Sequence, residues 1–417
     1  MLSIDDALTL IRDAVQPLAA ESVALAEALG RTLAEDVASD CDVPPHDKAL
    51  VDGYAVRTAD FLRRPMAEVS SPVELAVVEE VTAGAVPTVT LTAGHATRIM
   101  TGAPLPVGAD AVVMVEDTAW HAEAGVRGGV MHVNNAEFKI APDMNIMRRA
   151  ASIRRGQVVL HAGAALRPAE IGLLAEAGRR HAQVAARPRV AVLVTGNELV
   201  DAGLTPAAGQ IRNSNGPMLL AWARQRGAVT IDLGIARDDR AALAARVTEG
   251  LTADMLLLSG GVSAGILDLV PEVLTELGVR PLFHKVAVRP GRPLWFGRYE
   301  GKSGATLVFG LPGNPVGSLV CCELFVAAAL ERLFGRSGDH LAEMATLEGE
   351  YRQRGMRTTY HPARLRNEGA TAKIETVPWH GSGDLRALAD ANAWAIFPPG
   401  DRHYNNGDQI TCRRMFE

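Results

Sequence analysis

Three apolar runs between residues 190 and 309 each lead directly into a loop rich in glycine. These loops are Thr195–Leu199, Ser259–Ser263 and Gly310–Pro315. Because glycine has no side chain, backbone N–H groups in such loops can approach a phosphate closely, and serine hydroxyls and a helix N-terminus add further donors. A single glycine loop is equally typical of a tight turn, but three on successive strands favour a phosphate site. The residues that we expect to bind the ligand are Ser259, Gly260, Gly261, Ser263, Gly313 and Asn314.

Three acidic side chains lie in or beside these loops: Glu198, Asp238 and Asp268. Proteins hold Mg²⁺ with one or two carboxylates, together with water and the oxygens of a substrate phosphate. The three acids therefore predict a metal site next to the phosphate site. Asp238 and its neighbour Asp239 are equally typical of a residue that caps the helix after them.

A basic run, His284–Arg292, could hold an anion. If this run is an extended strand, Lys285, Ala287 and Arg289 project from the same face. Two cations on one face of a chain with a net charge of −6 would bind an oxyanion. The same pattern is as typical of a solvated strand face, so both interpretations stay open.

The elements that must position these side chains follow from the hydrophobic pattern of residues 189–335. Apolar runs alternate with helical stretches, which predicts a parallel sheet with helices on both faces. Ligands of such sheets bind beyond the carboxyl ends of the strands. The predicted strands are Val190–Val194, Val229–Leu233, Met255–Leu258 and Leu307–Phe309, and the predicted helices are 216–226, 238–250, 268–278 and 316–334.

The remainder of the chain has a different pattern. Helical spacing of apolar residues predicts a helix over residues 1–30 and another over 168–178. Residues 339–417 contain short strands typical of a small β-barrel or sandwich. Further β-like runs are expected at Val73–Val78, Val86–Leu91, Ala111–Val115 and Gly129–Val133. The expected fold class is a multidomain α/β plus β protein.

Composition limits the classes of function. A length of 417 residues suggests about three domains, and 48% hydrophobic residues suffice for buried cores. The negative net charge argues against partners such as nucleic acid or an anionic membrane. The four cysteines form no C-x-x-C pair, no run is long and apolar enough to span a membrane, and the first residues are acidic where a signal peptide is basic. We therefore expect a cytoplasmic protein.

Seven segments, in this order, resemble the molybdopterin molybdenumtransferases, the family of bacterial MoeA and of the gephyrin E domain. They are Pro44–Asp47, Val51–Arg57, Ile99–Pro104, Thr195–Leu199, Ser259–Ser263, Lys285–Pro293 and Leu311–Val316. The resemblance implies an elongated subunit that forms a homodimer, with a cleft between the α/β domain of one subunit and the N-terminal part of the other. The implied domains are an N-terminal linker domain at 1–51 and 142–187, an inserted β-rich domain at 52–141, a MogA-like α/β molybdopterin-binding domain at 188–338 and a C-terminal β-barrel at 339–417.

The activity implied by the resemblance is the insertion of molybdenum from molybdate into adenylylated molybdopterin. This reaction releases AMP and uses Mg²⁺ as cofactor. The implied partners are the pterin substrate, molybdate, a MogA-type adenylyltransferase and acceptor molybdoenzymes. An alternative is a divergent paralogue that binds molybdopterin or its nucleotide as a carrier without inserting metal.

The resemblance also implies roles for individual residues. Active-site residues of the family match Asp52, Thr101, Glu198, Asp238, Asp268 and Lys285, and prolines of its binding loop match Pro312 and Pro315. Arg289 and Arg292 stand where the family usually has lysines. Elsewhere the chain departs from the family pattern: Ser152 replaces an acid, Pro362 a common arginine and Arg386 a common serine.

Overall fold

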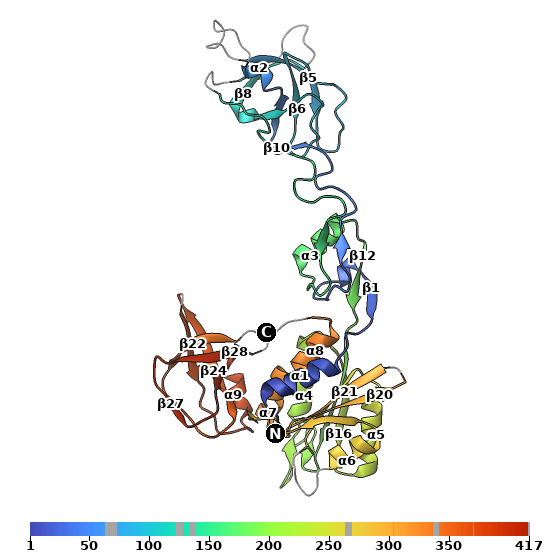
Figure 1. The fold of residues 1–417 in the computed structure, drawn as a ribbon, viewed down its shortest axis with the longest axis vertical. Helices are drawn as coiled ribbons and strands as arrows, with labels where there is room; N and C mark the ends of the chain where they lie inside the picture. Colours follow the sequence, from blue (N-terminus) through green and yellow to red (C-terminus); the bar gives the residue numbers. More distant parts are fainter. Residues whose placement is uncertain are drawn as a thin grey trace.

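The computed structural model of the chain describes residues 1–62, 73–121, 128–133, 138–262, 269–302, 304–336, 342–369 and 371–415. The molecule is elongated (Figure 1). A β-rich upper unit lies at one end, a small middle unit follows, and an α/β unit with a C-terminal barrel beside it forms the other end. The N-terminus lies in the α/β unit, so the chain runs up to the upper unit and returns.

The α/β unit is built on a six-stranded sheet in the order β16-β13-β17-β21-β20-β18. Its strands are β13 (Arg189–Thr195), β16 (Val229–Ala236), β17 (Met255–Ser259), β18 (Arg280–His284), β20 (Trp295–Gly301) and β21 (Gly304–Leu311). The first four strands in this order are parallel, as the sequence predicts. β20 instead runs antiparallel to both of its neighbours. The cause is local, because Gly301 pairs with Gly304 in a hairpin that reverses the chain between β20 and β21.

Helices cover both faces of this sheet, which confirms the predicted layers. Val190 and Val192 of β13 belong to one core, and Ala191 and Leu193 belong to the other, because successive side chains of a strand point to opposite faces. The helices are α4 (Asn215–Gln225), α5 (Arg240–Gly250), α6 (Leu269–Glu276), α7 (Pro315–Cys321) and α8 (Ala327–Leu333), with the π-helical turn η4 (Cys322–Val326) joining the last two.

The first helix is shorter than the sequence predicts. α1 (Ile4–Ala14) begins at Ser3, whose side chain accepts the N–H of Asp6, and it ends well before residue 30. Pro17 lies just beyond it, and proline removes a helical hydrogen bond and clashes with the preceding turn. Ala7 and Ile11 of α1 are buried in the α/β core. We therefore propose that α1 belongs with the α/β domain, although the resemblance places it in the linker domain.

The middle unit is made of two-stranded pairings around a small core. It contains β1 (Ala20–Ala24) paired with β12 (His181–Ala185), β2 (Val37–Ala38) paired with β11 (Val158–Leu160), the 3-10 turn η1 (Leu25–Glu27) and α3 (Pro168–Glu176), the helix predicted over 168–178. Strands from the early and the late segment pair with each other, so the upper unit is an insertion between them. β3 (Lys48–Ala49) and β10 (Ile146–Met147) pair at the joint between the two units.

The upper unit holds a second six-stranded sheet. Its elements are β4 (Gly53–Val56), α2 (Ala59–Leu62), β5 (Glu74–Val81), β6 (His95–Ile99), β7 (Ala111–Met114), η3 (Val115–Asp117), β8 (Thr118–His121) and β9 (Val130–Val133). Three of the four β-like runs predicted here are strands. The prediction of a strand at Val86–Leu91 is wrong. That segment contains Pro87, and its Val86 is 76% exposed, so it gains little from joining a half-buried sheet.

The C-terminal domain is a closed five-stranded barrel, which settles the choice between barrel and sandwich. β24 pairs with both β25 and β26, and the ring closes through β22 and β28. Its elements are β22 (Glu343–Glu348), β23 (Tyr351–Gln353), β24 (Thr358–Glu368), β25 (Thr371–Thr376), α9 (Leu385–Ala389), β26 (Ala393–Phe397), β27 (Arg402–Tyr404) and β28 (Gln409–Arg414). β19 (Val288–Arg289) of the basic run extends this sheet by pairing with β24. In the described part of the chain, no helix is long and apolar enough to cross a membrane.

Candidate active site

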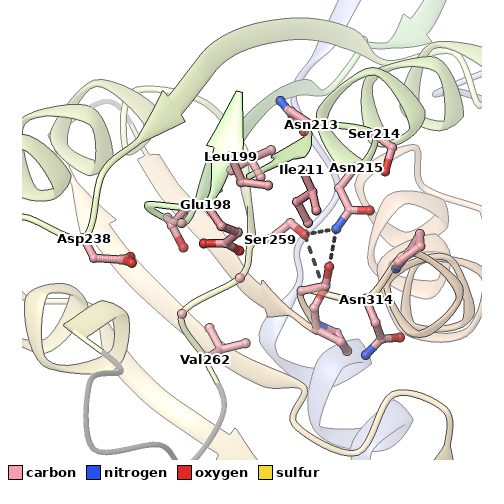
Figure 2. A pocket seen from close by; sticks show the side chains of 18 of the residues that line it. Glu198, Leu199, Ile211, Asn213, Ser214, Asn215, Asp238, Ser259, Val262 and Asn314 are labelled. Atoms are coloured by element: carbon pink, nitrogen blue, oxygen red, sulfur yellow. Dashed lines mark hydrogen bonds between the residues drawn. The ribbon is translucent and has the colours of Figure 1, made fainter. Parts of the chain in front are cut away.

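A cavity of about 400 Å³ opens at the carboxyl ends of β13, β17 and β21, and we call it the site cavity. The N-terminal ends of α4 and α7 border it, together with the short ribbon of β14 (Leu199–Val200) and β15 (Ile211–Arg212) (Figure 2). All three predicted glycine-rich loops meet here. The predicted residues that line the cavity are Glu198, Asp238, Ser259, Gly260, Gly261, Pro312, Gly313, Asn314 and Pro315.

Two glycines hold the Ser259 loop in a conformation that other residues would not adopt. Gly260 and Gly261 both have positive φ angles, +98° and +64°. A Cβ atom on Gly260 would lie 2.5 Å from the carbonyl oxygen of Thr195, and one on Gly261 would lie 2.7 Å from the Val270 side chain. The loop therefore keeps its backbone bare of side chains where it faces the cavity, as a phosphate-binding loop requires.

Asn215 connects the loops of the site cavity, and sequence reasoning missed it. Its side-chain amide donates hydrogen bonds of 2.8 Å to the Ser259 hydroxyl and of 2.8 Å to the Gly313 carbonyl (Figure 2). The Ser259 hydroxyl lies 3.3 Å from the Pro312 carbonyl, to which it donates. This hydroxyl is completely buried, so we expect the backbone of the loop, rather than the hydroxyl, to contact a ligand. The run Asn213–Asn215 at the start of α4 was the available signal, since asparagine and serine favour helix starts.

The two described acids lie on the β13 and β16 side of the cavity (Figure 2). Asp238 accepts the backbone N–H of Asn197 at 3.3 Å, and its own N–H donates to the Asn197 side-chain oxygen at 3.2 Å. Asp239, not Asp238, caps α5 by accepting the N–H of Ala242. The capping role that the sequence left open between them therefore falls to Asp239, which leaves the Asp238 carboxylate exposed at the cavity.

Glu198 folds back over Gly196, where a Cβ atom would lie 2.6 Å from a carboxylate oxygen. Two exposed carboxylates match the donor set that a partly hydrated Mg²⁺ prefers. Among the described residues, no group of three or more His, Cys, Asp or Glu side chains could hold a metal. Ser263 and the third predicted acid, Asp268, lie outside the described residues.

The basic run does not form the extended strand that the sequence suggests. Lys285 has a φ of +72°, in the left-handed region, and β18 already ends at His284. The turn at Lys285 breaks the alternation, so the prediction that Lys285 and Arg289 share one strand face is wrong. Lys285, Arg289 and Arg292 are not among the described residues that line the site cavity, although Pro293 is.

The run instead contributes to a group of three arginines, which we call the arginine cluster: Arg289, Arg292 and Arg357. Burial lowers the pKa of Arg357, and the positive charges of Arg289 and Arg292 lower it further. Arg357 also donates to the Val288 carbonyl at 3.3 Å, and Arg289 donates to the Arg354 carbonyl at 3.3 Å. No described carboxylate forms an ion pair with the cluster. Sequence reasoning missed Arg357, because the barrel supplies it from outside the basic run.

Asp52 and Thr101 pair with each other in the upper unit. The Thr101 N–H and hydroxyl both donate to one Asp52 carboxylate oxygen at 2.7 Å, and these hydrogen bonds lower the pKa of Asp52. Asp52 directly precedes β4, and Thr101 follows β6. Both residues therefore lie in the upper unit, at the opposite end of the molecule from the α/β sheet (Figure 1). Within one chain they are therefore separated from Glu198 and Asp238.

The positions that depart from the family pattern lie in three separate places. Ser152 is exposed at the joint of the upper and middle units, where its N–H donates to the Val43 carbonyl. Pro362 is buried in β24, opposite Trp394. The Arg386 side chain is 88% exposed and lies 3.7 Å from Asp390.

Comparison with known proteins gives matches along nearly the whole chain. Family models match for the MoeA N-terminal region (domains I and II) at residues 2–178, the "Probable molybdopterin binding domain" at 191–332 and the MoeA C-terminal region (domain IV) at 344–412. The molybdopterin molybdenumtransferase of Bacillus subtilis is 34% identical over 94% of this chain and 88% of its own length. That of a Nostoc species is 35% identical over 95% and 88%. A crystal structure of the MoeA protein of Pyrococcus horikoshii superposes with a TM-score of 0.82 at 31% identity, covering 100% of this chain and 99% of that one.

Proposed function

The chain belongs to the molybdopterin molybdenumtransferase family, and on that premise we propose that it inserts molybdenum from molybdate into adenylylated molybdopterin, with release of AMP. The observation that carries this proposal is the meeting of the three glycine-rich loops around one cavity, within a chain that matches the family from end to end. The substrate carries a phosphoanhydride, and its phosphate oxygens are acceptors that bare backbone N–H groups bind well.

We assign the phosphate groups of the substrate to the loops at Ser259–Gly261 and Pro312–Pro315. Gly260 and Gly261 expose backbone in positive-φ conformations that favour glycine, and Asn215 holds their loop against Gly313. Asn314 caps α7 by accepting the N–H of Gly317, and Pro315 occupies its first turn. The loops are thus held in place before the substrate arrives, which lowers the ordering cost of binding.

Glu198 and Asp238 are the residues that would hold Mg²⁺, with Asp268 as a third candidate. When bound, the ion would neutralise negative charge on the phosphoanhydride as AMP departs. Asn197 fixes the backbone around Asp238, so that this carboxylate stays directed to the cavity. The exposure of both acids leaves room for water and phosphate oxygens in the remaining coordination positions.

The arginine cluster is the proposed binding site for molybdate, with Lys285 nearby in the chain. The cluster is a region of strong positive charge in an acidic protein. Its three guanidinium groups form no ion pair with a carboxylate in the described structure. Guanidinium groups donate several hydrogen bonds in a fixed plane, which suits a tetrahedral oxyanion. The cluster adjoins Pro293, so molybdate would lie beside the site cavity rather than among the phosphate loops.

We further propose that the working form is a homodimer in which Asp52 and Thr101 of one subunit complete the site of the other. The support is their separation from the site cavity within one chain, together with their predicted role. The protein would receive its substrate from a MogA-type adenylyltransferase and pass its product to acceptor molybdoenzymes. All four cysteines are free, three of them buried, which fits a reducing cytoplasm.

The assignment of the acids can be tested with neighbouring variants. Asp238→Asn should lower AMP release from adenylylated molybdopterin by at least about 100-fold, because a ligand for the charge-neutralising cation is lost. Asp239→Asn is the matched control, since asparagine caps a helix as well as aspartate does and should leave the rate near that of the unmodified protein. Equal rates for both variants would remove Asp238 from the site.

A further inference from the structure

The long helix behind the site cavity is interrupted by a buried π turn. η4 joins α7 to α8, and the Ala327 N–H donates to the Cys322 carbonyl, five residues back. In a regular α-helix this N–H would donate to the Glu323 carbonyl. The π turn therefore releases the Glu323 carbonyl, and the residue is only 1% exposed, so water does not satisfy it.

An arginine of the barrel takes the place of the missing donor. The Arg413 guanidinium donates to the Glu323 carbonyl at 2.6 Å. Arg413 belongs to β28, so this hydrogen bond joins the C-terminal domain to the α/β unit. Burial lowers the pKa of Arg413 below that of an exposed arginine, and the negative charge of Glu323 opposes this shift.

The Glu323 carboxylate has its own partners on the α/β side. It accepts the Trp222 indole N–H at 2.7 Å and pairs with Arg226 at 2.8 Å. The Arg226 guanidinium also lies over the Trp222 ring, 4.9 Å from its centre. The side chain of Glu323 is thus fixed within the α/β unit, and its backbone carbonyl accepts the hydrogen bond from the barrel.

The strands of the barrel connect Arg413 to the arginine cluster. Arg413 pairs with Trp394 of β26, and Trp394 pairs with Pro362 of β24. The same strand β24 begins at Thr358, which pairs with Val288, and Arg357 directly precedes it. A closed barrel has little freedom to shear, so the position of β28 sets the position of Arg357.

We propose that the hydrogen bond from Arg413 to the π-turn carbonyl of Glu323 is a latch that holds the barrel at the angle where Arg357 joins Arg289 and Arg292. Arg413 is then a positioning residue for oxyanion binding, an inference that rests on the proposed function. It contacts neither the site cavity nor the arginine cluster, and it acts through the barrel.

The kinetic test separates the two substrates. In Arg413→Met, the molybdate concentration for half-maximal AMP release should rise about tenfold, whereas that for adenylylated molybdopterin should stay within about twofold. Arg413→Lys should restore part of the molybdate affinity, because an ammonium group can still donate to the carbonyl. Arg366→Met, which removes an exposed arginine of the same barrel, should change neither value. An unchanged molybdate value in a folded Arg413→Met protein, or an equal rise for both substrates, would overturn the latch.

A distance measurement tests the latch without turnover. Spin labels at Met344→Cys in the barrel and Val229→Cys in the α/β sheet occupy exposed positions, with Cys41 replaced by serine. The distance between the two labels should have a narrow distribution in the labelled protein that keeps Arg413, and a clearly broader distribution in the labelled Arg413→Met variant. Identical distributions would refute the latch. If the unmodified protein releases no AMP at all, the proposed function fails. The spin-label measurement still decides whether the latch exists.

Discussion

At the scale of single residues, the site cavity depends on contacts that hold its loops together before any ligand binds. Asn215 is the clearest case, because one buried amide joins the end of β17, the start of α4 and the loop ahead of α7. Gly260 is the second, because its backbone conformation excludes a side chain. Substitution of either residue would change the geometry of the loops without changing the charge of the site.

Replacement of Asn215 by alanine should leave the buried Ser259 hydroxyl and the Gly313 carbonyl without their common donor. We expect a loss of about 1–3 kcal/mol in the free energy of unfolding, measured with urea. The concentration of adenylylated molybdopterin for half-maximal rate should rise as well, because the two phosphate loops separate. Asn367→Ala, at an exposed barrel position, serves as the control and should change neither quantity.

Gly260→Ala should strain the loop, because alanine at a φ of +98° would place its Cβ 2.5 Å from the Thr195 carbonyl oxygen. The expected cost is about 1–3 kcal/mol of stability together with a marked loss of substrate binding. Gly172→Ala in α3 is the comparison, since a Cβ there meets no atom within 4 Å. Equal thermal stability and equal substrate binding for the two variants would contradict the inference that the loop excludes a side chain at position 260.

At the scale of elements, the sequence allowed the α/β unit to be predicted closely, because alternating apolar strands and helices leave a periodic signal. Val190 and Ala191 enter different cores, and that two-sided burial is what the continuous apolar runs reflect. The left-handed turn at Lys285 left no such signal. It accompanies a loop that pairs with Leu2 on one side and with the barrel on the other, contacts that are distant in sequence. The roles of Arg357 and Asn215 could not be predicted for the same reason, because both depend on contacts with residues distant in sequence.

The joint between the upper and middle units should be sensitive to acid. Asp42 accepts the Arg155 N–H and pairs with Arg149, and these contacts lower the pKa of Asp42 in the folded protein. Its contribution to stability is therefore complete above the unfolded value near 3.9 and is lost as the pH falls through the lower folded value. In calorimetry, the melting temperature of Asp42→Asn should lie below that of the unmodified protein at pH 6–7, and the difference should shrink below about pH 4.

A control variant checks that this effect belongs to the joint. Glu35→Gln removes an exposed acid of the middle unit, whereas the Asp42 side chain is only partly exposed. It should show a smaller difference in melting temperature across the same pH range. If the Asp42→Asn difference were independent of pH, the charge of Asp42 would not stabilise the joint.

At the scale of the whole molecule, the elongated shape separates two sets of predicted site residues. Asp52 and Thr101 lie in the upper unit, and Glu198 and Asp238 lie in the α/β unit at the other end (Figure 1). A single subunit cannot bring them together, so the account requires a second copy. The sequence could suggest this only through the family resemblance, because no local pattern encodes which subunit completes a site.

Mixing experiments test the shared site. Asp52→Asn and Asp238→Asn should each be nearly inactive as separate homodimers. After exchange of subunits in an equal mixture, half of the dimers are mixed and each has one intact site of two, so about a quarter of the unmodified activity should return. A mixture no more active than its components would place both residues in the same subunit's site or exclude one of them.

The most direct measurement of the central claim is the ratio of AMP released to molybdenum bound in the pterin product, with Mg²⁺ and adenylylated molybdopterin present and with molybdate added or withheld. The account predicts AMP release that depends on molybdate, with one AMP for each molybdenum inserted. Tight binding of the adenylylated pterin with no AMP release, whether or not molybdate is present, would contradict it and would instead identify a carrier.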